Sequence, residues 1–145
     1  MDVQVAQIED VDGWIRLVET VKDQFPGLDI DTYQAVLLKR IEQQSALLVK
    51  KDDAVLGALL FSKTKNELQF LAVHPDYRQQ GIATALIRNM FSLLPKAATV
   101  TVITYREDDT KGTAARKLYE RMGFVPGALV MEFGYPCQVF SYVTI

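Results

Sequence analysis

The segment from residue 67 to residue 94 constrains the fold more than any other part of the chain. Residues 67–73 form a mostly apolar run that predicts a strand, residues 81–94 carry apolar side chains at helical spacing, and a short polar turn joins the two. A second strand is predicted at residues 100–105, where β-branched residues are concentrated. A strand, a helix and another strand in this order indicate a parallel right-handed crossover.

The turn at the start of this helix has the features of an anion-binding site. The first turn of any helix leaves backbone N–H groups without partners, and the helix dipole adds partial positive charge there. Gly81 and Ala83 have little or no side chain, so a phosphate could lie directly on the backbone amides. Arg78 can add a full charge. The turn therefore predicts a phosphate-bearing ligand without specifying which one.

The other hydrophobic patterns predict further strands and helices around this unit. Strands are expected at residues 3–8, 46–50, 55–61, 129–133 and 139–144. Three more helices are expected, starting at Asp10 or Asp12, at Asp31 or Thr32, and at Asp109 or Thr110. At 145 residues the chain can bury its own core. We therefore expect one mixed α/β domain over residues 1–145, with Trp14 in the core.

Composition excludes several classes of function. The net charge is −2, and no dense run of Lys and Arg offers a nucleic-acid surface. No apolar run approaches the ~20 residues of a membrane span, and the first residues do not resemble a secretory signal, so we expect a cytoplasmic protein. Cys137 and His74 are the only residues of their types, which excludes an internal disulfide and a Cys/His zinc cluster. We expect no metal.

Two motifs, in this order, resemble the GNAT superfamily of acyl-CoA-dependent N-acetyltransferases. The family turn Gln/Arg-x-x-Gly-x-Gly/Ala is matched by Arg78, Gly81 and Ala83. The family segment Leu-Tyr-x-x-x-Gly-Phe is matched by Leu118, Tyr119, Gly123 and Phe124. The resemblance implies a central mixed, mostly antiparallel sheet of about seven strands. It also implies a parallel pair that splays apart at the centre and about four flanking helices.

The resemblance also implies acetyl-CoA as co-substrate. Its pyrophosphate would lie on the amides of the turn, and its pantetheine arm would run along the strand before the turn, in the slot between the two splayed strands. The residues implied in this binding are Leu71, Ala72, Val73, Arg78, Gln79, Gln80, Gly81, Ile82, Ala83 and Thr84. A substrate amine would approach from the other side of the slot and attack the thioester directly.

Tyr119 and Glu67 are the candidate catalytic residues that the resemblance implies. Tyr119 matches the family tyrosine that protonates the departing thiolate, whereas helical periodicity alone favours a packing role. Glu67 occupies the position of the general base in some members, and otherwise would be an exposed carboxylate at the start of a strand. We expect structural roles for His74 and for Cys137, which has no neighbouring cation in sequence to lower its pKa.

The chain departs from the family pattern at Gly112, where many members have an asparagine that contacts pantetheine or assists the tyrosine. The expected acceptor is a primary amine of a small molecule or a peptide, with residues 25–31 and 134–140 around its pocket. A homodimer is compatible with the resemblance. The alternative is a non-catalytic acyl-CoA-binding or regulatory module of the same fold. The chain lacks the glycine motifs of P-loop nucleotide hydrolases and dinucleotide oxidoreductases.

Overall fold

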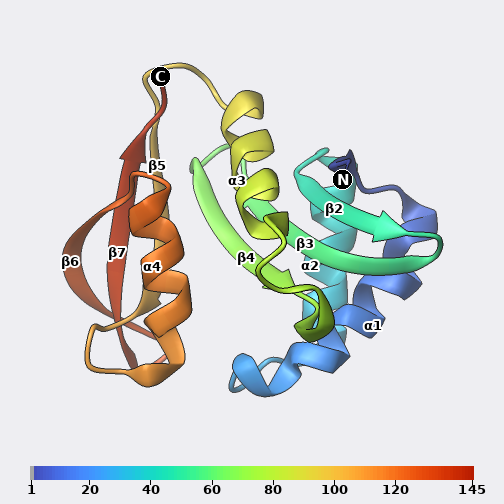
Figure 1. Ribbon diagram of the computed structural model, residues 1–145, viewed down its shortest axis with the longest axis horizontal. Helices are drawn as coiled ribbons and strands as arrows, with labels where there is room; N and C mark the ends of the chain where they lie inside the picture. The colour runs from blue at the N-terminus through green and yellow to red at the C-terminus, as the bar shows by residue number, and fades with distance from the viewer. Residues whose placement is uncertain (1) are drawn as a thin grey trace.

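The computed structural model describes residues 2–145, in which a seven-stranded sheet is flanked by four α-helices (Figure 1). The strands are β1 (Gln4–Val5), β2 (Ala46–Lys51), β3 (Ala54–Ser62), β4 (Glu67–Val73), β5 (Thr99–Tyr105), β6 (Val125–Glu132) and β7 (Tyr135–Val143). The α-helices are α1 (Val11–Val21), α2 (Ile30–Glu42), α3 (Ile82–Leu93) and α4 (Thr113–Arg121). Short 3-10 turns lie at Ile8–Asp10, Lys22–Gln24, Pro75–Tyr77 and Thr110–Gly112.

The strand order is β1-β2-β3-β4-β5-β7-β6, and β4 with β5 is the parallel pair. The other neighbours run antiparallel. The crossover from β4 through α3 to β5 is the strand, helix and strand unit that residues 67–105 predict. The expected fold class is therefore confirmed: a mixed α/β fold with a mostly antiparallel sheet and a central parallel pair.

The parallel pair is joined only at one end. Its register contains Glu67 with Thr101 and Leu68 with Val102, after which the two seven-residue strands are no longer paired. The register of β4 with β3 shifts at the same place, because Leu68 faces Phe61 and Phe70 faces Leu60. Gln69 is thus an extra residue, and such a bulge bends a strand and increases its twist. Figure 1 shows β4 and β5 diverging below this point.

Helices cover both faces of the sheet and give two cores. Helices α1 and α2 pack on one face around a cluster that includes Trp14, Leu37 and Phe70. Trp14 is fully buried, as predicted. Helices α3 and α4 cover the other face around Leu86, Met90, Tyr119 and Phe140. We call these the α1/α2 face and the α3/α4 face. Gly57 lets α3 approach β3, since a Cβ there would overlap Ile82 Cγ2.

Several element boundaries differ in detail from the predictions. Asp29, rather than Asp31 or Thr32, caps α2, because its carboxylate accepts the backbone N–H of Thr32. Asp10 occupies the N-cap position of α1, one of the two predicted positions, but its side chain makes no capping hydrogen bond. Strand β6 begins at Val125, earlier than expected, and contains Pro126. A proline is tolerated there because β6 lies at the edge of the sheet.

Candidate active site

The open end of the β4–β5 pair exposes backbone groups of β4. The N–H of His74 bonds the carbonyl of Leu56 on β3 at 2.7 Å. Since successive residues of a strand direct their backbone groups to opposite sides, Ala72 also faces β3, whereas Leu71 and Val73 direct N–H and C=O into the gap. Of the three strand residues expected beside pantetheine, Leu71 and Val73 have their polar groups in the right direction.

The start of α3 lies next to this gap and carries free N–H groups. Gln79 and Gly81 both have left-handed φ, of 63° and 83°. The N–H of Ala85 bonds the carbonyl of Gly81, so the three preceding N–H groups of the helix have no intrahelical partner. A Cβ on Gly81 would meet nothing within 4 Å. Arg78 Nε lies 3.4 Å from the carbonyl oxygen of Val73, at the end of β4. The predicted anion site is therefore open.

Tyr119 lies on the α3/α4 face at the level where β4 and β5 part. Its ring packs against Phe124 and Phe140, with ring centroids 5.6 and 6.2 Å apart. Phe140 pairs with Val102, and Val102 forms the last pair with β4. Tyr119 is 6% exposed, and its burial raises the pKa of the hydroxyl above the ordinary value. The hydroxyl therefore stays protonated, as an acid must before it acts.

Glu67 lies at the same level as Tyr119 but on the α1/α2 face. Its Oε1 accepts a hydrogen bond from Gln69 Nε2 at 3.0 Å, and Gln69 Oε1 in turn accepts one from Arg40 Nε of α2 at 2.9 Å. The structure does not bring Glu67 and Tyr119 together, because the sheet lies between them. Two reactants that enter from opposite faces would each meet one of these residues.

The segments expected around the acceptor flank the open end of the pair. Phe25, after α1, packs with a tilted ring against Phe70 of β4, with 4.8 Å between the ring centroids. Tyr135, at the start of β7, packs edge-on against Tyr105 at the end of β5, with centroids 5.3 Å apart. Residues 25–31 and 134–140 therefore lie on the two sides of the gap.

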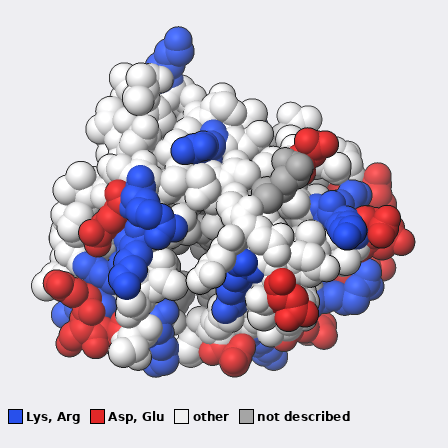
Figure 2. Space-filling view, in the orientation of Figure 1, with Lys and Arg blue, Asp and Glu red and all other residues white. Residues whose placement is uncertain are grey.

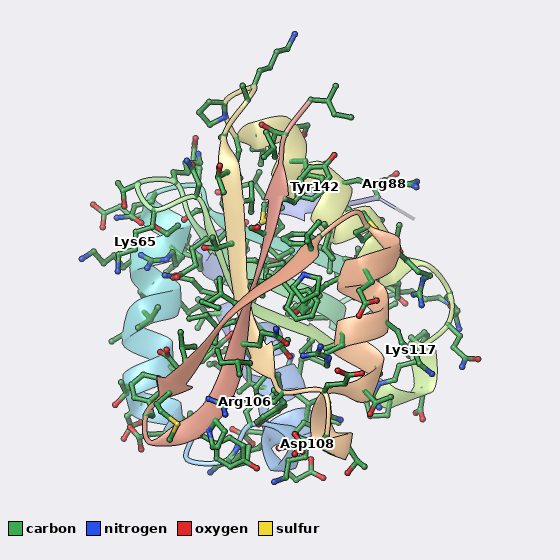
Figure 3. The ribbon with its side chains drawn as sticks, turned by 90° about the vertical axis from the view of Figure 1, so that its left-hand side faces the viewer. Lys65, Arg88, Arg106, Asp108, Lys117 and Tyr142 are labelled. Atoms are coloured by element: carbon green, nitrogen blue, oxygen red, sulfur yellow. The ribbon has the colours of Figure 1, made fainter. Side chains whose placement is uncertain are left out.

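A surface pocket of about 420 Å³ lies beside Tyr135. Its lining is Arg106, Asp108, Asp109, Thr110, Tyr135 and Pro136. Figure 3 shows Arg106 and Asp108 at the end of β5, near the turn between β6 and β7, whereas Tyr142 lies toward the other end of β7. Residues 106–110 were not among the sequence candidates. The one sequence feature that could have indicated them is their position directly after a predicted central strand.

Three side chains form a polar chain at this pocket. Tyr135 Oη donates to Asp109 Oδ2 at 2.9 Å and accepts from Lys111 Nζ at 2.8 Å. The backbone N–H of Lys111, followed by the Tyr135 hydroxyl, holds the pKa of Asp109 below its ordinary value. The hydrogen bond to Tyr135 raises the pKa of Lys111. The pocket wall is therefore charged and internally paired near neutral pH.

A family model described as acetyltransferase (GNAT) family matches residues 14–124. The chain belongs to the GNAT acetyltransferase family. The enzyme class predicted from the two motifs, an acetyl-CoA-dependent N-acetyltransferase, is thereby confirmed at the level of the family. A search of curated protein sequences found no match to the chain.

Solved structures show the same fold at low sequence identity. A GNAT-family acetyltransferase from Bacillus cereus superposes with a TM-score of 0.80 at 21% identity, over 99% of this chain and 97% of that one. The ribosomal-protein-S18-alanine N-acetyltransferase of Escherichia coli gives 0.77 at 16%, over 99% and 94%. The protein yncA of Salmonella typhimurium, solved with its cofactor acetyl-CoA, gives 0.73 at 13%, over 98% and 92%. The GNAT fold is therefore shown.

The hollow between the two halves of the GNAT sheet is visible on the α3/α4 face. Figure 2 shows it between α4 and the start of α3, with Lys and Arg side chains on both sides. On the α4 side, Lys117 and Arg121 are exposed basic residues of the helix, whereas Arg116 is buried and donates to the carbonyl of Tyr105 and to Gln138 Oε1. This charge favours an anionic ligand on the α3/α4 face.

Gly112 has a structural explanation in this GNAT domain. A Cβ at this position would lie 2.7 Å from Cβ and 3.4 Å from Cα of Tyr105. The chain therefore has no room for the asparagine that the family pattern often has here.

The contacts of His74 and the burial of Cys137 support the structural roles that we predict for them. His74 Nδ1 accepts the N–H of Asp76 at 3.1 Å. Cys137 is buried, and this burial raises the pKa of its thiol even though the charge of Arg106 acts in the opposite direction. Arg106 is far from Cys137 in sequence, and its charge does not activate the thiol.

The part of the chain that the structure describes, residues 2–145, holds no group of three or more His, Cys, Asp or Glu side chains suited to a metal ion. Within the same residues, every helix is too short or too polar to cross a membrane.

Proposed function

We propose that this GNAT domain transfers the acetyl group of acetyl-CoA to a primary amine of a small molecule or peptide, by direct attack while both substrates are bound. The observation that carries the proposal is the open β4–β5 pair. It has free helix amides and basic side chains on the α3/α4 face, and a carboxylate and aromatic side chains on the α1/α2 face. Two substrates could therefore meet through one opening.

The residues of this chain fit acetyl-CoA. The free N–H groups at the start of α3 and the open space at Gly81 suit a pyrophosphate. Leu71 and Val73 offer backbone groups to an extended amide-containing arm, as an added strand would use them. Acetyl-CoA supplies the acyl group as an activated thioester. The solved complex of yncA with acetyl-CoA supports this assignment at the level of the shared fold.

Holding the amine beside the thioester is the main contribution that we assign to the protein. Near-attack positioning can lower a barrier by about 7–11 kcal/mol. A positioned acid or base contributes about 10²- to 10⁴-fold in rate, or roughly 3–5 kcal/mol. A backbone N–H of Leu71 or Val73 that faces the carbonyl oxygen would stabilise the negative charge that develops there. Much of the catalysis therefore rests on backbone geometry.

Side chains on opposite faces complete the proton transfers. Glu67, on the α1/α2 face, accepts a proton from the substrate ammonium and leaves the nitrogen lone pair free to attack. Tyr119, on the α3/α4 face, donates its hydroxyl proton to the sulfur as the carbon–sulfur bond breaks. The placement of the two residues supports this division, because each lies on the face from which its reactant would enter.

A cationic amine is the acceptor class that the surroundings favour. Asp108 lines the pocket at the end of β5, and Asp29 and Asp31 lie at the start of α2. Carboxylates at the mouth of a site attract cations. The Escherichia coli neighbour is named for acetylation of an alanine in a ribosomal protein, so a peptide with a free N-terminus also belongs among the candidates.

The test is release of CoA thiol by the purified protein with spermidine, an aminoglycoside, free lysine and a short peptide with a free N-terminus. At least one amine should give amine-dependent release. Tyr119→Phe should lower kcat by about 10²-fold or more. Tyr142→Phe is the matched control, because it removes a hydroxyl from the same core, where Tyr142 stacks on Phe91.

Two results would contradict the proposal. Tight binding of acetyl-CoA without thiol release on the whole panel would favour the non-catalytic binding module. Equal rates for Tyr119→Phe and the parent would show that another group protonates the leaving thiolate.

A further inference from the structure

A hydrogen-bonded chain of three side chains ends on the Glu67 carboxylate. Arg40 Nε donates to Gln69 Oε1 at 2.9 Å, and Gln69 Nε2 donates to Glu67 Oε1 at 3.0 Å. A guanidinium can only donate and an ionised carboxylate can only accept. The orientation of the Gln69 amide between them is therefore fixed, with its oxygen toward Arg40 and its NH₂ group toward Glu67.

The bulge in β4 places Gln69 in this chain. Before the bulge, Leu68 belongs to the core of the α3/α4 face, and after it, Phe70 belongs to the core of the α1/α2 face. Gln69 is the extra residue between them, and its side chain meets Arg40 on the α1/α2 face. The residue at which β4 leaves β5 is thus also the residue that holds the carboxylate.

We propose that Gln69 and Arg40 are positioning residues for acetyl transfer, because they orient the Glu67 carboxylate toward the acceptor amine. The inference rests on the proposed function. Gln69 binds Oε1, and among residues 2–145 no hydrogen bond reaches Oε2. Oε2 is therefore the oxygen that takes the proton from the substrate ammonium, while the nitrogen keeps its electron pair for the attack.

Arg40 acts through its charge and its anchoring and does not relay the proton. A guanidinium stays protonated in proteins, so no proton can leave through it. Its hydrogen bond polarises the Gln69 amide and strengthens the N–H that holds Glu67. Arg40 Nη1 also donates to Gln43 Oε1 at 3.0 Å, at the end of α2, which fixes the guanidinium. These hydrogen bonds thus tie the Glu67 carboxylate to α2, on the α1/α2 face from which the acceptor would enter.

The experiment is a double-mutant cycle between Gln69→Met and Glu67→Gln, with the panel amine that the parent acetylates fastest. Methionine keeps the length of glutamine but cannot donate. Gln69→Met should lower kcat by about tenfold or more and leave the KM for acetyl-CoA within about twofold of the parent value, since only part of the base contribution is lost. In the Glu67→Gln background it should have no further effect on kcat.

Arg40→Met should show the same dependence on Glu67 as Gln69→Met. Gln43→Met is the matched control, because it removes the other partner of Arg40 and leaves the contact with Gln69 in place. Its kcat should equal that of the parent. Urea unfolding of every variant separates a loss of orientation from a loss of stability.

The outcomes distinguish the inference from the function on which it rests. If Glu67→Gln is slow but Gln69→Met has the parent kcat, or lowers kcat equally in both backgrounds, the positioning role is wrong and the base remains. If Glu67→Gln is as fast as the parent, the base itself is wrong and the positioning role falls with it. If the parent protein acetylates no amine of the panel, both the proposed function and the positioning role are contradicted.

Discussion

Gly112 lies where the backbone of α4 begins, and the nearest atoms to its missing side chain belong to Tyr105. Its φ of −98° is one that any residue can adopt. Replacing glycine by alanine at such a position normally stabilises a protein by about 0.4–1 kcal/mol, because the unfolded chain loses freedom. The 2.7 Å approach to Tyr105 Cβ opposes this gain. The sign of the change in the free energy of unfolding therefore shows whether backbone propensity or packing dominates at this position.

We predict that Gly112→Ala and Gly112→Asn both lower the free energy of unfolding, by about 1–3 kcal/mol, because overpacking outweighs propensity. Urea unfolding measures the effect. Thr113→Ala, at the exposed next residue, should change the free energy of unfolding by less than about 0.5 kcal/mol. A Gly112→Asn variant as stable as the parent would show that Tyr105 yields readily and that the family asparagine is absent for another reason.

The strand-turn-helix element was the part of the fold that local pattern determined best. Residues 67–73 form β4 with the predicted bounds, and α3 starts one residue after Gly81. The cap of α2 was not determined in the same way, since Asp29, Asp31 and Thr32 can all cap a helix and lie within four residues. The bulge at Gln69 had no sequence signal, because an isolated polar residue in a strand equally describes a regular exposed position.

At the start of α3, we predict that Gly81→Ala weakens acetyl-CoA binding by about tenfold or more, equal to about 1.4 kcal/mol. The added methyl would occupy the open space above the amides, and the φ of 83° adds strain of about 1–2 kcal/mol to folding. Titration calorimetry with acetyl-CoA measures binding, and urea unfolding measures the strain.

Gly27→Ala is a matched control for this element. Gly27 has a φ of 80°, and a Cβ there also meets nothing within 4 Å, but it lies in the connection between α1 and α2. It should show the same strain without the loss of affinity. Equal losses of acetyl-CoA affinity in the two variants would mean that Gly81 acts only through its backbone conformation.

At the scale of the whole molecule, the site depends on contacts between residues far apart in sequence. The pocket joins residues 106–110 with Tyr135 and Pro136, which meet because β5 pairs with β7. The separation of Glu67 and Tyr119 onto opposite faces follows from the alternation of side chains along β4 and from the face of the sheet on which α4 packs. Single-sequence patterns give the elements but not these pairings, so the roles of both residues came from family resemblance. The cytoplasmic location and the homodimer stay predictions.

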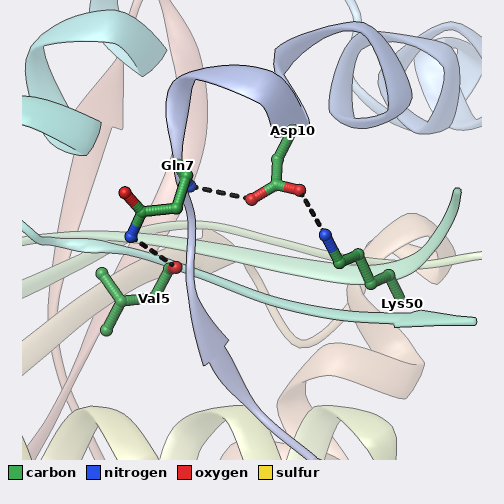
Figure 4. Close-up of polar contacts among 4 residues, drawn as sticks. All are labelled: Val5, Gln7, Asp10 and Lys50. Carbon is green, nitrogen blue, oxygen red and sulfur yellow. Dashed lines mark hydrogen bonds and ion pairs between the residues drawn. The ribbon is translucent and has the colours of Figure 1, made fainter.

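Asp10 and Lys50 connect two parts of the molecule that are distant in sequence. Lys50 Nζ of β2 lies 2.7 Å from Asp10 Oδ1, directly before α1, and Asp10 Oδ2 accepts the N–H of Gln7 at 2.8 Å (Figure 4). The Asp10 side chain is 6% exposed. Burial acts to raise the pKa of Asp10, but the hydrogen bonds from Lys50 and Gln7 and the charge of Lys50 together hold it below the ordinary value. The hydrogen bond to Asp10 raises the pKa of Lys50.

The directions of these shifts set the pH window in which the contact stabilises the fold. A depressed carboxyl pKa contributes stability above the unfolded-state value of about 3.9, which is lost as the pH falls through the lower folded value. A raised ammonium pKa contributes stability below the unfolded-state value of about 10.4, which is lost as the pH rises through the folded value. The contact should therefore stabilise the protein fully between about pH 4 and pH 10.

We predict that Asp10→Asn lowers the free energy of unfolding by about 1–3 kcal/mol at pH 7, because a charge-assisted pair becomes a neutral contact beside a charged Lys50. The difference from the parent should shrink as the pH falls below about 4, since Asp10 then becomes neutral in the parent as well. Urea unfolding at closely spaced pH values measures this. Asp12→Asn, at an exposed carboxylate two residues away, should differ little from the parent throughout. A deficit for Asp10→Asn that stays constant from pH 7 down to pH 2.5 would mean that the side-chain shape of Asp10, and not its charge, holds α1 to β2.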